Sequence, residues 1–304
     1  MNRRRFIIII ANPAAGRRRR RRLDSVLGHL QEMGAEVRIM WTRREGDGTD
    51  RALAAVQEQP DLIVAAGGDG TINEVLNGMA YSGIPLGFLP LGTANVLAVE
   101  TGMPSRPDRL AALLLNGETL TVRPGRVAGA AGHLFLLMAG AGLDAEAIDQ
   151  LCPKTKRRIG KGAYARAIVD RLRKRPLSHI EITVDGEPLT GCFAVISKSR
   201  CYGGAFALTP DASLAADTFE VCVFSPANRF RLLWQLAAVR FGGHLTMKDV
   251  RTRRGEHVLA TCPEESFYQT DGDLRGPLPA EFTLSDVTLP LVCPAPFPRT
   301  SAGA

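Results

Sequence analysis

The chain has 304 residues, about twice the length of a common single domain, so its length favours two domains. Hydrophobic residues make up 45% and charged residues 23%, a composition that excludes a disordered chain. The longest apolar runs fall well short of the ~20 residues that a membrane span needs. The apolar start at residues 6–11 has no signal-peptide cleavage site after it, so we expect a cytoplasmic protein.

Positive charge is concentrated near the N-terminus. The net charge is +7, and residues 1–51 account for all of it, with thirteen arginines against six acidic residues. A second basic cluster spans residues 154–175. No helix-turn-helix, zinc or aromatic-rich signature accompanies this charge, so we expect an anionic membrane surface as the partner, with peripheral association, and no nucleic acid. The six cysteines lack CxxC spacing and the five histidines are scattered, which argues against zinc chemistry and a Ser-His-Asp triad.

The first half of the chain alternates apolar runs with helical patterns. We predict strands over residues 5–11, 36–41, 62–66 and 85–89, and helices over residues 17–34, 49–59, 71–79, 94–100 and 106–115. Strands that are buried on both faces and separated by helices are typical of βαβ units. The fold class predicted for the N-terminal domain is therefore α/β with a parallel sheet.

The pattern changes near residue 120. Short alternating segments follow, with predicted helices over residues 162–173 and 229–241, and with predicted strands over residues 119–127, 133–139, 179–184, 191–198, 218–224, 257–261 and 281–288. This pattern predicts a β-rich, sandwich-like C-terminal domain. We place the domains at residues 1–121 and 122–290, and we expect the tail, 291–304, to pack back on the first domain.

Three loops in the first half follow predicted strands and share one chemistry. They span residues 12–16, 67–71 and 90–95, and each contains glycine with asparagine or threonine. In a parallel sheet such loops gather at the carboxyl edge, where ligands bind. Glycine lets backbone N–H groups approach an oxyanion, and the following helix directs its positive end there. The sequence predicts a phosphate site, with Thr71 and Glu74 as a capping box at the start of the helix.

Six stretches resemble the diacylglycerol kinase catalytic domain family, which contains bacterial lipid kinases and the sphingosine and ceramide kinases. They are NPAAG at 12–16, GGDGTINEVLNG at 67–78, PLGTANVLA at 90–98, AGAGLDAEA at 139–147, LTPDASLAADTFEV at 208–221 and QTDGD at 269–273. Their order and spacing fit over nearly the whole chain. The resemblance implies a two-domain kinase with its active site in an inter-domain cleft, and ATP and Mg²⁺ as cofactors.

The resemblance also implies roles for individual residues. The residues implied to bind ATP are Asn12, Pro13, Ala14, Ala15, Gly16, Thr42, Gly67, Gly68, Asp69, Gly70, Thr71, Ile72, Asn73 and Thr93. Asp69 would lie near the phosphates and a catalytic Mg²⁺. A structural Mg²⁺ would be held by the Asp217 carboxylate with the backbone carbonyls of Leu214 and Phe219. The general base would be Asp273, with Asp271 beside it.

Two departures from the family pattern bear on this site. The family usually has Glu where this chain has Asp273, which shortens the reach by one methylene and keeps the carboxylate. Many members have an Asp where this chain has Arg123, which removes one acidic partner from the implied metal network. Read without the resemblance, Asp271-Gly272 is simply a hairpin turn, which this dipeptide favours.

The leading hypothesis is an ATP- and Mg²⁺-dependent lipid kinase that phosphorylates a hydroxyl of a membrane lipid. A soluble-substrate kinase of the NAD kinase type and a non-catalytic nucleotide-binding regulatory protein are the alternatives. The sequence does not choose among diacylglycerol, a sphingoid base and ceramide as the substrate. It also leaves open a homodimer and whether the arginines at 17–22 contact membrane.

Overall fold

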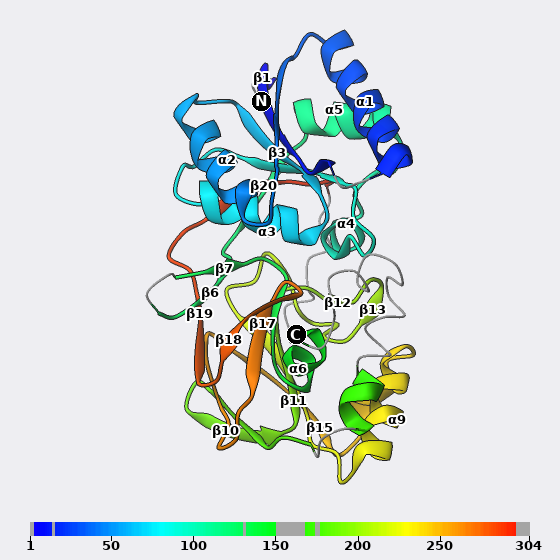
Figure 1. Ribbon diagram of the computed structural model, residues 1–304, viewed down its shortest axis with the longest axis vertical. Coiled ribbons are helices and arrows are strands. Elements are labelled where there is room, and N and C mark those ends of the chain that lie inside the picture. The colour runs from blue at the N-terminus through cyan, green and yellow to red at the C-terminus, as the bar shows by residue number, and fades with distance from the viewer. Residues whose placement is uncertain (1–2, 14–15, 130–131, 150–167, 174–176, 296–304) are drawn as a thin grey trace. The chain divides into compact units, whose positions relative to one another are not determined.

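The computed structural model describes residues 3–13, 16–129, 132–149, 168–173 and 177–295. The chain forms two compact units, coloured from blue to red along the sequence in Figure 1. Unit 1 comprises Met1–Pro124 and Asp286–Ala304, and unit 2 comprises Gly125–Ser285. Unit 1 is thus built from both ends of the chain.

Unit 1 contains a six-stranded sheet in the order β2-β1-β3-β4-β20-β5. Its strands are β1 (Phe6–Ala11), β2 (Glu36–Trp41), β3 (Leu62–Gly67), β4 (Leu86–Pro90), β5 (Thr119–Val122) and β20 (Leu289–Val292). All neighbouring pairs are parallel except β20 with β5. The isoleucines at 7–10 have no exposed surface, because a parallel strand inside such a sheet is covered on both faces.

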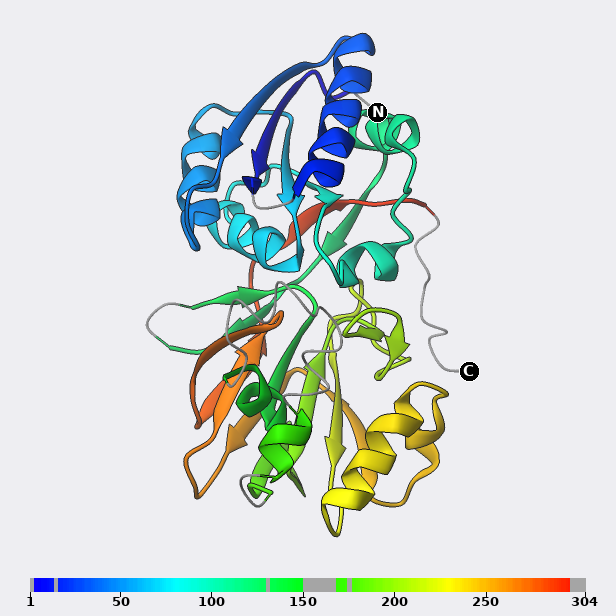
Figure 2. The ribbon, with the colours of Figure 1, turned by 45° about the vertical axis from the view of Figure 1, so that its right-hand side comes forward.

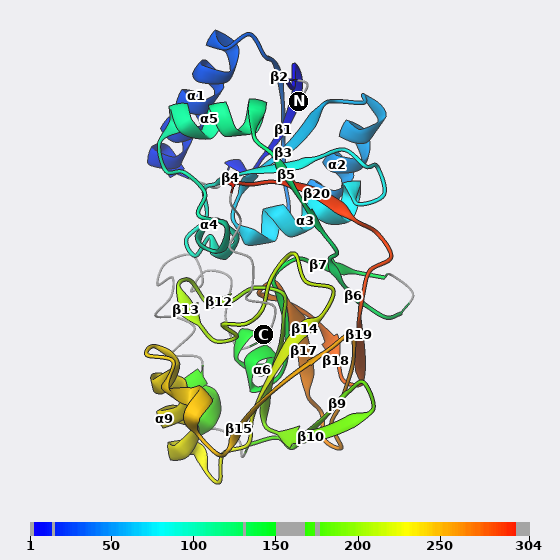
Figure 3. The same ribbon diagram turned by 180° about the vertical axis from the view of Figure 1, so that it is seen from behind.

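Helices cover both faces of this sheet (Figures 1 and 3). Those with described bounds are α1 (Gly16–Glu32), α2 (Asp47–Gln57), α3 (Asp69–Met79), α4 (Val96–Thr101) and α5 (Pro107–Asn116). One core joins α1 and α5 to β1 and β3, with Leu23, Val26 and Leu30 of α1 as its buried stripe. Their spacing of three and four residues places them on one face of the helix. The predicted α/β fold class with a parallel sheet is confirmed.

Unit 2 is β-rich, as predicted. Two six-stranded antiparallel sheets have the orders β10-β9-β16-β19-β6-β7 and β15-β14-β11-β8-β17-β18, and β12 pairs with β13. The strands are β6 (Gly125–Val127), β7 (Leu134–Phe135), β8 (Met138–Gly142), β9 (Ile180–Val184), β10 (Glu187–Gly191), β11 (Phe193–Ser197), β12 (Cys201–Tyr202), β13 (Phe206–Ala207), β14 (Phe219–Phe224), β15 (Val250–Gly255), β16 (His257–Thr261), β17 (Phe267–Thr270), β18 (Asp273–Pro277) and β19 (Ala280–Leu284).

The core of unit 2 lies between its two large sheets. Alternate residues of β9 and of β14 point into it, including Ile182 and Val221, and Phe135 stacks on Phe219 at a centroid distance of 5.8 Å. Side chains thus alternate along the strands between the core and the outside, and the inward side chains of both sheets form one core. This packing is that of a β-sandwich. In the described residues of unit 2, the helices α6 (Leu143–Asp149) and α9 (Arg229–Val239) and the 3₁₀ turn η2 (Gly243–Thr246) lie outside the sheets (Figure 2).

Several predicted elements differ from the observed ones. The strand predicted at 281–288 is β19, and β20 follows it as a separate strand in the sheet of unit 1. Pro290 concealed β20, because proline removes a ladder donor and argues against a strand in sequence analysis. The strand predicted at 119–127 divides at Pro124 into β5 and β6. The helix predicted at 162–173 is described only over residues 168–173.

Candidate active site

The predicted phosphate loops begin at one edge of the unit 1 sheet. The register pairs Ala11 with Ala66, and Gly67 with Pro90, so β1, β3 and β4 end at the same level. The Asn12 N–H donates to the Ala66 carbonyl at 3.0 Å. The loops that follow these three strands therefore lie side by side. Ligands of parallel α/β sheets bind at this position, beyond the carboxyl ends of the strands.

The second and third loops touch through two glycines. A Cβ on Gly92 would lie 2.6 Å from the Gly68 Cα, and a Cβ on Gly68 would lie 3.3 Å from the Gly92 Cα. The Leu91 N–H also donates to the Gly67 carbonyl at 2.7 Å. A side chain at Gly92 would push the two loops apart, and one at Gly68 would make a tight contact, so the close approach of the loops depends above all on glycine at position 92.

Asp69 connects these loops at the start of two helices. Gly68 is the N-cap of α3, so Asp69 is its first residue. The two Asp69 carboxylate oxygens accept the N–H groups of Val96 and Leu97, at 3.0 and 3.2 Å, at the start of α4. Burial raises the pKa of Asp69, and the two N–H donors oppose that shift. The carboxylate thus holds the third loop against the second, while its role near Mg²⁺ stays a prediction.

The predicted capping box at Thr71 and Glu74 is wrong. The helix α3 begins at Asp69, and the Glu74 carboxylate instead accepts the N–H groups of Gly46 and Gly48, each at 2.9 Å. These donors lie at the N-terminus of α2, whose N-terminal N–H groups have no partners within the helix. Glu74 therefore caps a neighbouring helix, a contact that local sequence spacing does not reveal.

The other residues that were predicted to bind ATP differ in how far they are buried. Thr42 is buried after β2, and its N–H donates to the Ala11 carbonyl at 3.0 Å, beside the first loop. Thr93 is exposed in the third loop. Ile72 and Asn73 are buried within α3, which is less suited to direct contact with a nucleotide. Two predicted residues, Ala14 and Ala15, lie outside the described residues.

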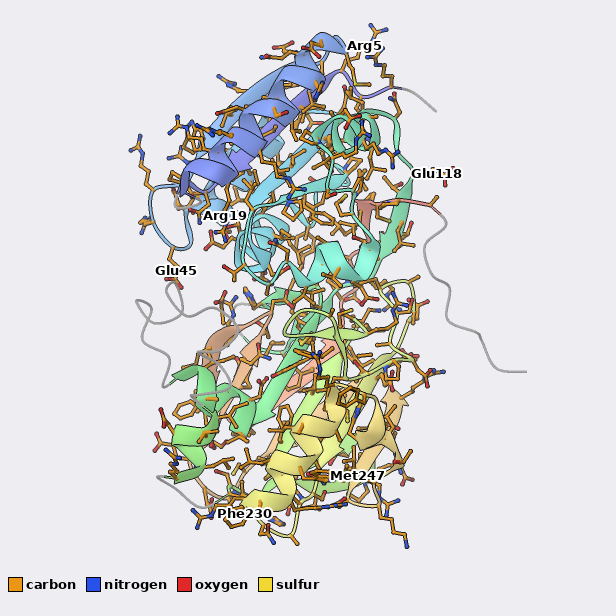
Figure 4. All side chains as sticks on the ribbon, turned by 90° about the vertical axis from the view of Figure 1, so that its right-hand side faces the viewer. Arg5, Arg19, Glu45, Glu118, Phe230 and Met247 are labelled. Carbon is orange, nitrogen blue, oxygen red and sulfur yellow. The ribbon has the colours of Figure 1, made fainter. Side chains whose placement is uncertain are left out.

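Two arginines of α1 reach the third loop, which the sequence did not suggest. The Arg19 guanidinium donates to the Thr93 hydroxyl at 3.3 Å, and the Arg22 guanidinium donates to the Pro90 carbonyl at 3.3 Å. Arg19 lies on the first turns of α1 in Figure 4. Their spacing of three residues places both on one face of the helix. This spacing was the only feature of the sequence that could have distinguished these two arginines from their neighbours. They bring positive charge to the phosphate loops.

Asp271 and Asp273 lie on the hairpin between β17 and β18 of unit 2. Asp271 and Gly272 have φ values of 49° and 88°, the left-handed conformation that a two-residue hairpin turn favours. The Asp271 carboxylate accepts three backbone N–H groups, those of residues 136, 137 and 138, at 2.8, 2.9 and 3.1 Å. Asp271 therefore anchors the hairpin to the segment between β7 and β8.

Asp273 lies two residues further along, and its side chain is 35% exposed. It begins β18 and lies 3.8 Å from the Arg275 guanidinium, in a partly buried position. Burial, together with the positive charge of Arg275, lowers the pKa of His133 to about 4, and the negative charge of Asp273 opposes this shift. The charges of Asp273, Arg275 and His133 are thus coupled.

A network of polar side chains holds the hairpin turn through hydrogen bonds. The Gly272 N–H donates to the Gln269 side-chain carbonyl at 2.7 Å, and the Gln269 amide donates to the Asp144 carboxylate at 2.7 Å. The Tyr202 hydroxyl donates to the other Asp144 oxygen. Asp144 belongs to the AGAGLDAEA stretch, but sequence analysis predicted no role for it. It links β12 and α6 to the turn that carries Asp273.

The predicted structural metal residues lie where β14 begins. Asp217 is exposed, whereas Leu214 and Phe219 are buried. One carboxylate with backbone carbonyls is a donor set that suits Mg²⁺. The Lys198 ammonium donates to the carbonyl of Ala216 in the same turn. Across the described residues, His, Cys, Asp and Glu side chains nowhere gather in threes at metal-binding distance.

Charges of both signs lie near this turn, because Asp211 and Arg254 act on the pKa of Glu220 in opposite directions. Burial, and then the charge of Asp211, raise the pKa of Glu220 to about 7. Glu220 follows Phe219 in β14. The Asp217 carboxylate and the backbone carbonyls fit the implied ion in donor chemistry, although the Lys198 ammonium already brings a positive charge to this turn.

Comparisons with known proteins give the family. A model described as the diacylglycerol kinase catalytic domain matches residues 6–127, and a model described as the YegS C-terminal NAD kinase beta sandwich-like domain matches residues 138–293. The diacylglycerol kinase of Bacillus subtilis (strain 168) is 32% identical over 266 residues, which cover 86% of each chain. The chain belongs to the diacylglycerol kinase family.

Other relatives of this lipid kinase extend over most of the chain. The diacylglycerol kinase of Mycobacterium tuberculosis (strain H37Rv) is 28% identical over 277 residues, 89% of each chain. A crystal structure of a diacylglycerol kinase from Bacillus anthracis str. Sterne has a TM-score of 0.76 at 19% identity, and covers 97% of this chain and 99% of that one. At this identity the structure shows a shared fold. Along the described parts of the lipid kinase, no helix combines the length and the hydropathy of a bilayer-spanning segment.

Proposed function

We propose that this lipid kinase transfers the γ-phosphoryl group of ATP, with Mg²⁺, to the hydroxyl of a membrane lipid such as diacylglycerol, a sphingoid base or ceramide. The observation that carries the proposal is the pair of touching glycine loops at residues 67–71 and 90–95, which end parallel strands. Such loops present backbone N–H groups to phosphate, and α3 adds the positive end of a helix.

The ATP phosphates would be bound by main-chain groups of these loops and by Arg19. Arg19 already donates to Thr93, so its guanidinium lies within reach of an anion at the third loop. A planar guanidinium is well suited to phosphate oxygens. Asp69 would act by positioning, because its carboxylate fixes the two loops relative to each other.

Mg²⁺ would be held at the phosphates near Asp69 and, as a structural ion, by Asp217 with the carbonyls of Leu214 and Phe219. When bound near the phosphates, the ion supplies neutralisation of the charge on the transferring group. The chain's own contribution is to keep these donors in place, with the Lys198 ammonium bound to the adjacent carbonyl of Ala216.

Asp273 would be the general base. As the lipid hydroxyl oxygen forms a bond to the γ-phosphorus, the bond to the β–γ bridging oxygen breaks, ADP leaves, and the hydroxyl proton passes to Asp273. Asp271 would position this base, because its carboxylate is already occupied by three N–H groups. The network through Gln269 and Asp144 would hold the same turn.

The lipid substrate implies contact with a membrane, and we propose peripheral association of a cytoplasmic enzyme with an anionic surface. Arg20 and Arg21 of α1 are exposed. Each basic residue near an anionic surface contributes about 1 kcal/mol at low salt, and this attraction weakens as salt increases.

A phosphorylation screen tests the proposed function. We expect transfer from ATP with Mg²⁺ to at least one of diacylglycerol, sphingosine and ceramide in mixed micelles, and none to NAD. Transfer to NAD alone would replace the lipid substrate by a soluble one. Absence of transfer to every acceptor, from protein that binds ATP, would contradict the kinase proposal.

Asp273→Asn tests the base on the acceptor so identified. We expect kcat to fall about 10²–10⁴-fold, with ATP affinity unchanged, because the variant keeps the size of the side chain and loses the proton acceptor. Asp273→Glu should retain activity, and Asp286→Asn, at an exposed carboxylate, should behave as wild type. A wild-type kcat for Asp273→Asn would show that another group is the base.

A further inference from the structure

Helix α9 of unit 2 presents an apolar face to solvent. Its buried residues are Leu232, Gln235 and Val239. On the opposite face Phe230 is 76% exposed and Trp234 is 63% exposed, and beyond the helix end Phe241 is 85% exposed. The solvent side of a surface helix normally carries polar side chains. The solvent side of α9 instead carries large aromatic side chains. Figure 4 shows Phe230 at the N-terminal end of α9, on the outside of unit 2.

The segment that carries these aromatic residues is basic. Between residues 229 and 248 the sequence contains three arginines and one lysine, and it contains no aspartate or glutamate. The Arg240 guanidinium carbon lies 5.8 Å from the centre of the Phe241 ring. Exposed aromatic rings bordered by arginine and lysine are the composition of an interfacial helix, whose rings enter the boundary between headgroups and acyl chains.

The helix is held as a preformed element. The Asn228 side chain caps it by accepting the Arg231 N–H at 3.0 Å. The Arg231 guanidinium then makes two hydrogen bonds to the Asp249 carboxylate, at 2.7 and 2.8 Å. Because α9 is fixed at its start and along its buried side, Trp234 stays on the outer face, where it is 63% exposed.

We propose that the outer face of α9, with Phe230 and Trp234, docks on a lipid bilayer that contains anionic headgroups, together with the exposed residues Arg240, Phe241 and Lys248 that follow the helix. The proposal rests on the proposed function in one respect: a kinase of membrane lipids must reach a bilayer surface. Insertion of the rings contributes by removing apolar area from water, and the basic side chains contribute by attraction to the headgroups.

Charge favours a bilayer over a second copy of the chain as the occupant. A two-fold interface places the same patch on both sides. It would bring Arg240 and Lys248 of one copy close to the same residues of the other, whereas Arg231 is already paired with Asp249. An anionic lipid surface provides the opposite charge.

Vesicle binding without any kinase substrate tests the proposal. We would measure co-sedimentation of the full chain with phosphatidylcholine vesicles that contain phosphatidylglycerol, and with pure phosphatidylcholine vesicles. We expect binding to the anionic vesicles and at least about tenfold weaker binding by the double variant Trp234→Ala/Phe241→Ala. The control, Leu53→Ala/Tyr81→Ala, removes two similarly exposed apolar side chains from unit 1 and should bind as wild type.

Fluorescence reports the depth of Trp234 directly. The chain has two tryptophans, so Trp41→Phe leaves Trp234 as the only one. We expect its emission to shift to shorter wavelength on addition of anionic vesicles. Bound protein with unshifted Trp234 emission, or undiminished binding by the α9 double variant, would overturn the proposal.

Two further measurements separate the possible failures. If the α9 double variant changes a dimer into a monomer by light scattering while vesicle binding is unchanged, the face is an interface between copies and the bilayer proposal is wrong. The kinase assay with a panel of short-chain diacylglycerol, sphingosine and ceramide, which need no bilayer, is independent of docking. Retained activity there with lost vesicle binding supports the inference, whereas absent activity in the wild type contradicts the proposed function alone.

Discussion

At the scale of single residues, the candidate phosphate site depends on the contact between Gly68 and Gly92. This contact lets two loops from different strands share one surface, and Asp69 secures it through the N–H groups of Val96 and Leu97. Both features lie within motifs that sequence analysis recognises. Their mutual contact depends on the register of β3 and β4.

Gly92→Ala should separate the loops. Its Cβ would lie 2.6 Å from the Gly68 Cα and from the Asn95 side-chain oxygen, so the backbone must move. We expect the KM for ATP to rise about tenfold or more, because a shift of about 1 Å in a binding group has large kinetic effects.

The matched control is Gly28→Ala in α1. A Cβ at Gly28 meets no atom within 4 Å, and alanine favours a helix by about 0.5–1 kcal/mol relative to glycine. We expect a slightly raised Tm and an unchanged KM for ATP. If Gly92→Ala had the same effect as Gly28→Ala, the close approach of the loops would not matter for nucleotide binding.

At the scale of elements, a buried ion pair joins separate parts of unit 2. The Arg171 guanidinium lies 2.6 Å from the Glu146 carboxylate of α6, and their side chains are 4% and 8% exposed. The hydroxyls of Ser178 and Ser266 donate to the other Glu146 oxygen at 2.8 and 2.9 Å. Four segments thus meet at one carboxylate.

Arg171→Ala should destabilise the protein by about 3–5 kcal/mol, because it leaves a buried carboxylate without its cation. Chemical denaturation measures this loss, and adding Glu146→Gln to the same chain should recover part of it. Arg173→Ala, two residues along and exposed, is the control and should change stability by less than about 0.5 kcal/mol. Equal effects of the two arginine variants would contradict the role of the ion pair.

At the scale of the whole molecule, the end of the chain completes the fold of unit 1. After the β-sandwich, β20 enters the first sheet between β4 and β5. The sequence indicated a return of the tail, but it did not indicate a strand at residues 289–292. Leu291 has no exposed surface there.

Leu291→Ala should therefore cost about 2–5 kcal/mol, the range for a buried leucine whose removal leaves a cavity. Thermal unfolding of the full chain measures the loss, with Leu53→Ala, the same change at a 54% exposed position, as the control. A truncation after Ser285 should prevent unit 1 from folding. A truncated chain that binds ATP as tightly as the wild type would refute the need for β20.

The sequence by itself determined the fold class, the order of strands and helices in the first half, the family and the positions of the loops that follow β1, β3 and β4. These follow from local patterns, because hydrophobic period and glycine placement act over a few residues. The tertiary structure alone decided what each polar side chain contacts. Glu74 caps α2, Asp271 holds the segment before β8, and Arg19 reaches Thr93, since partners of a side chain are chosen by packing between segments far apart in the sequence.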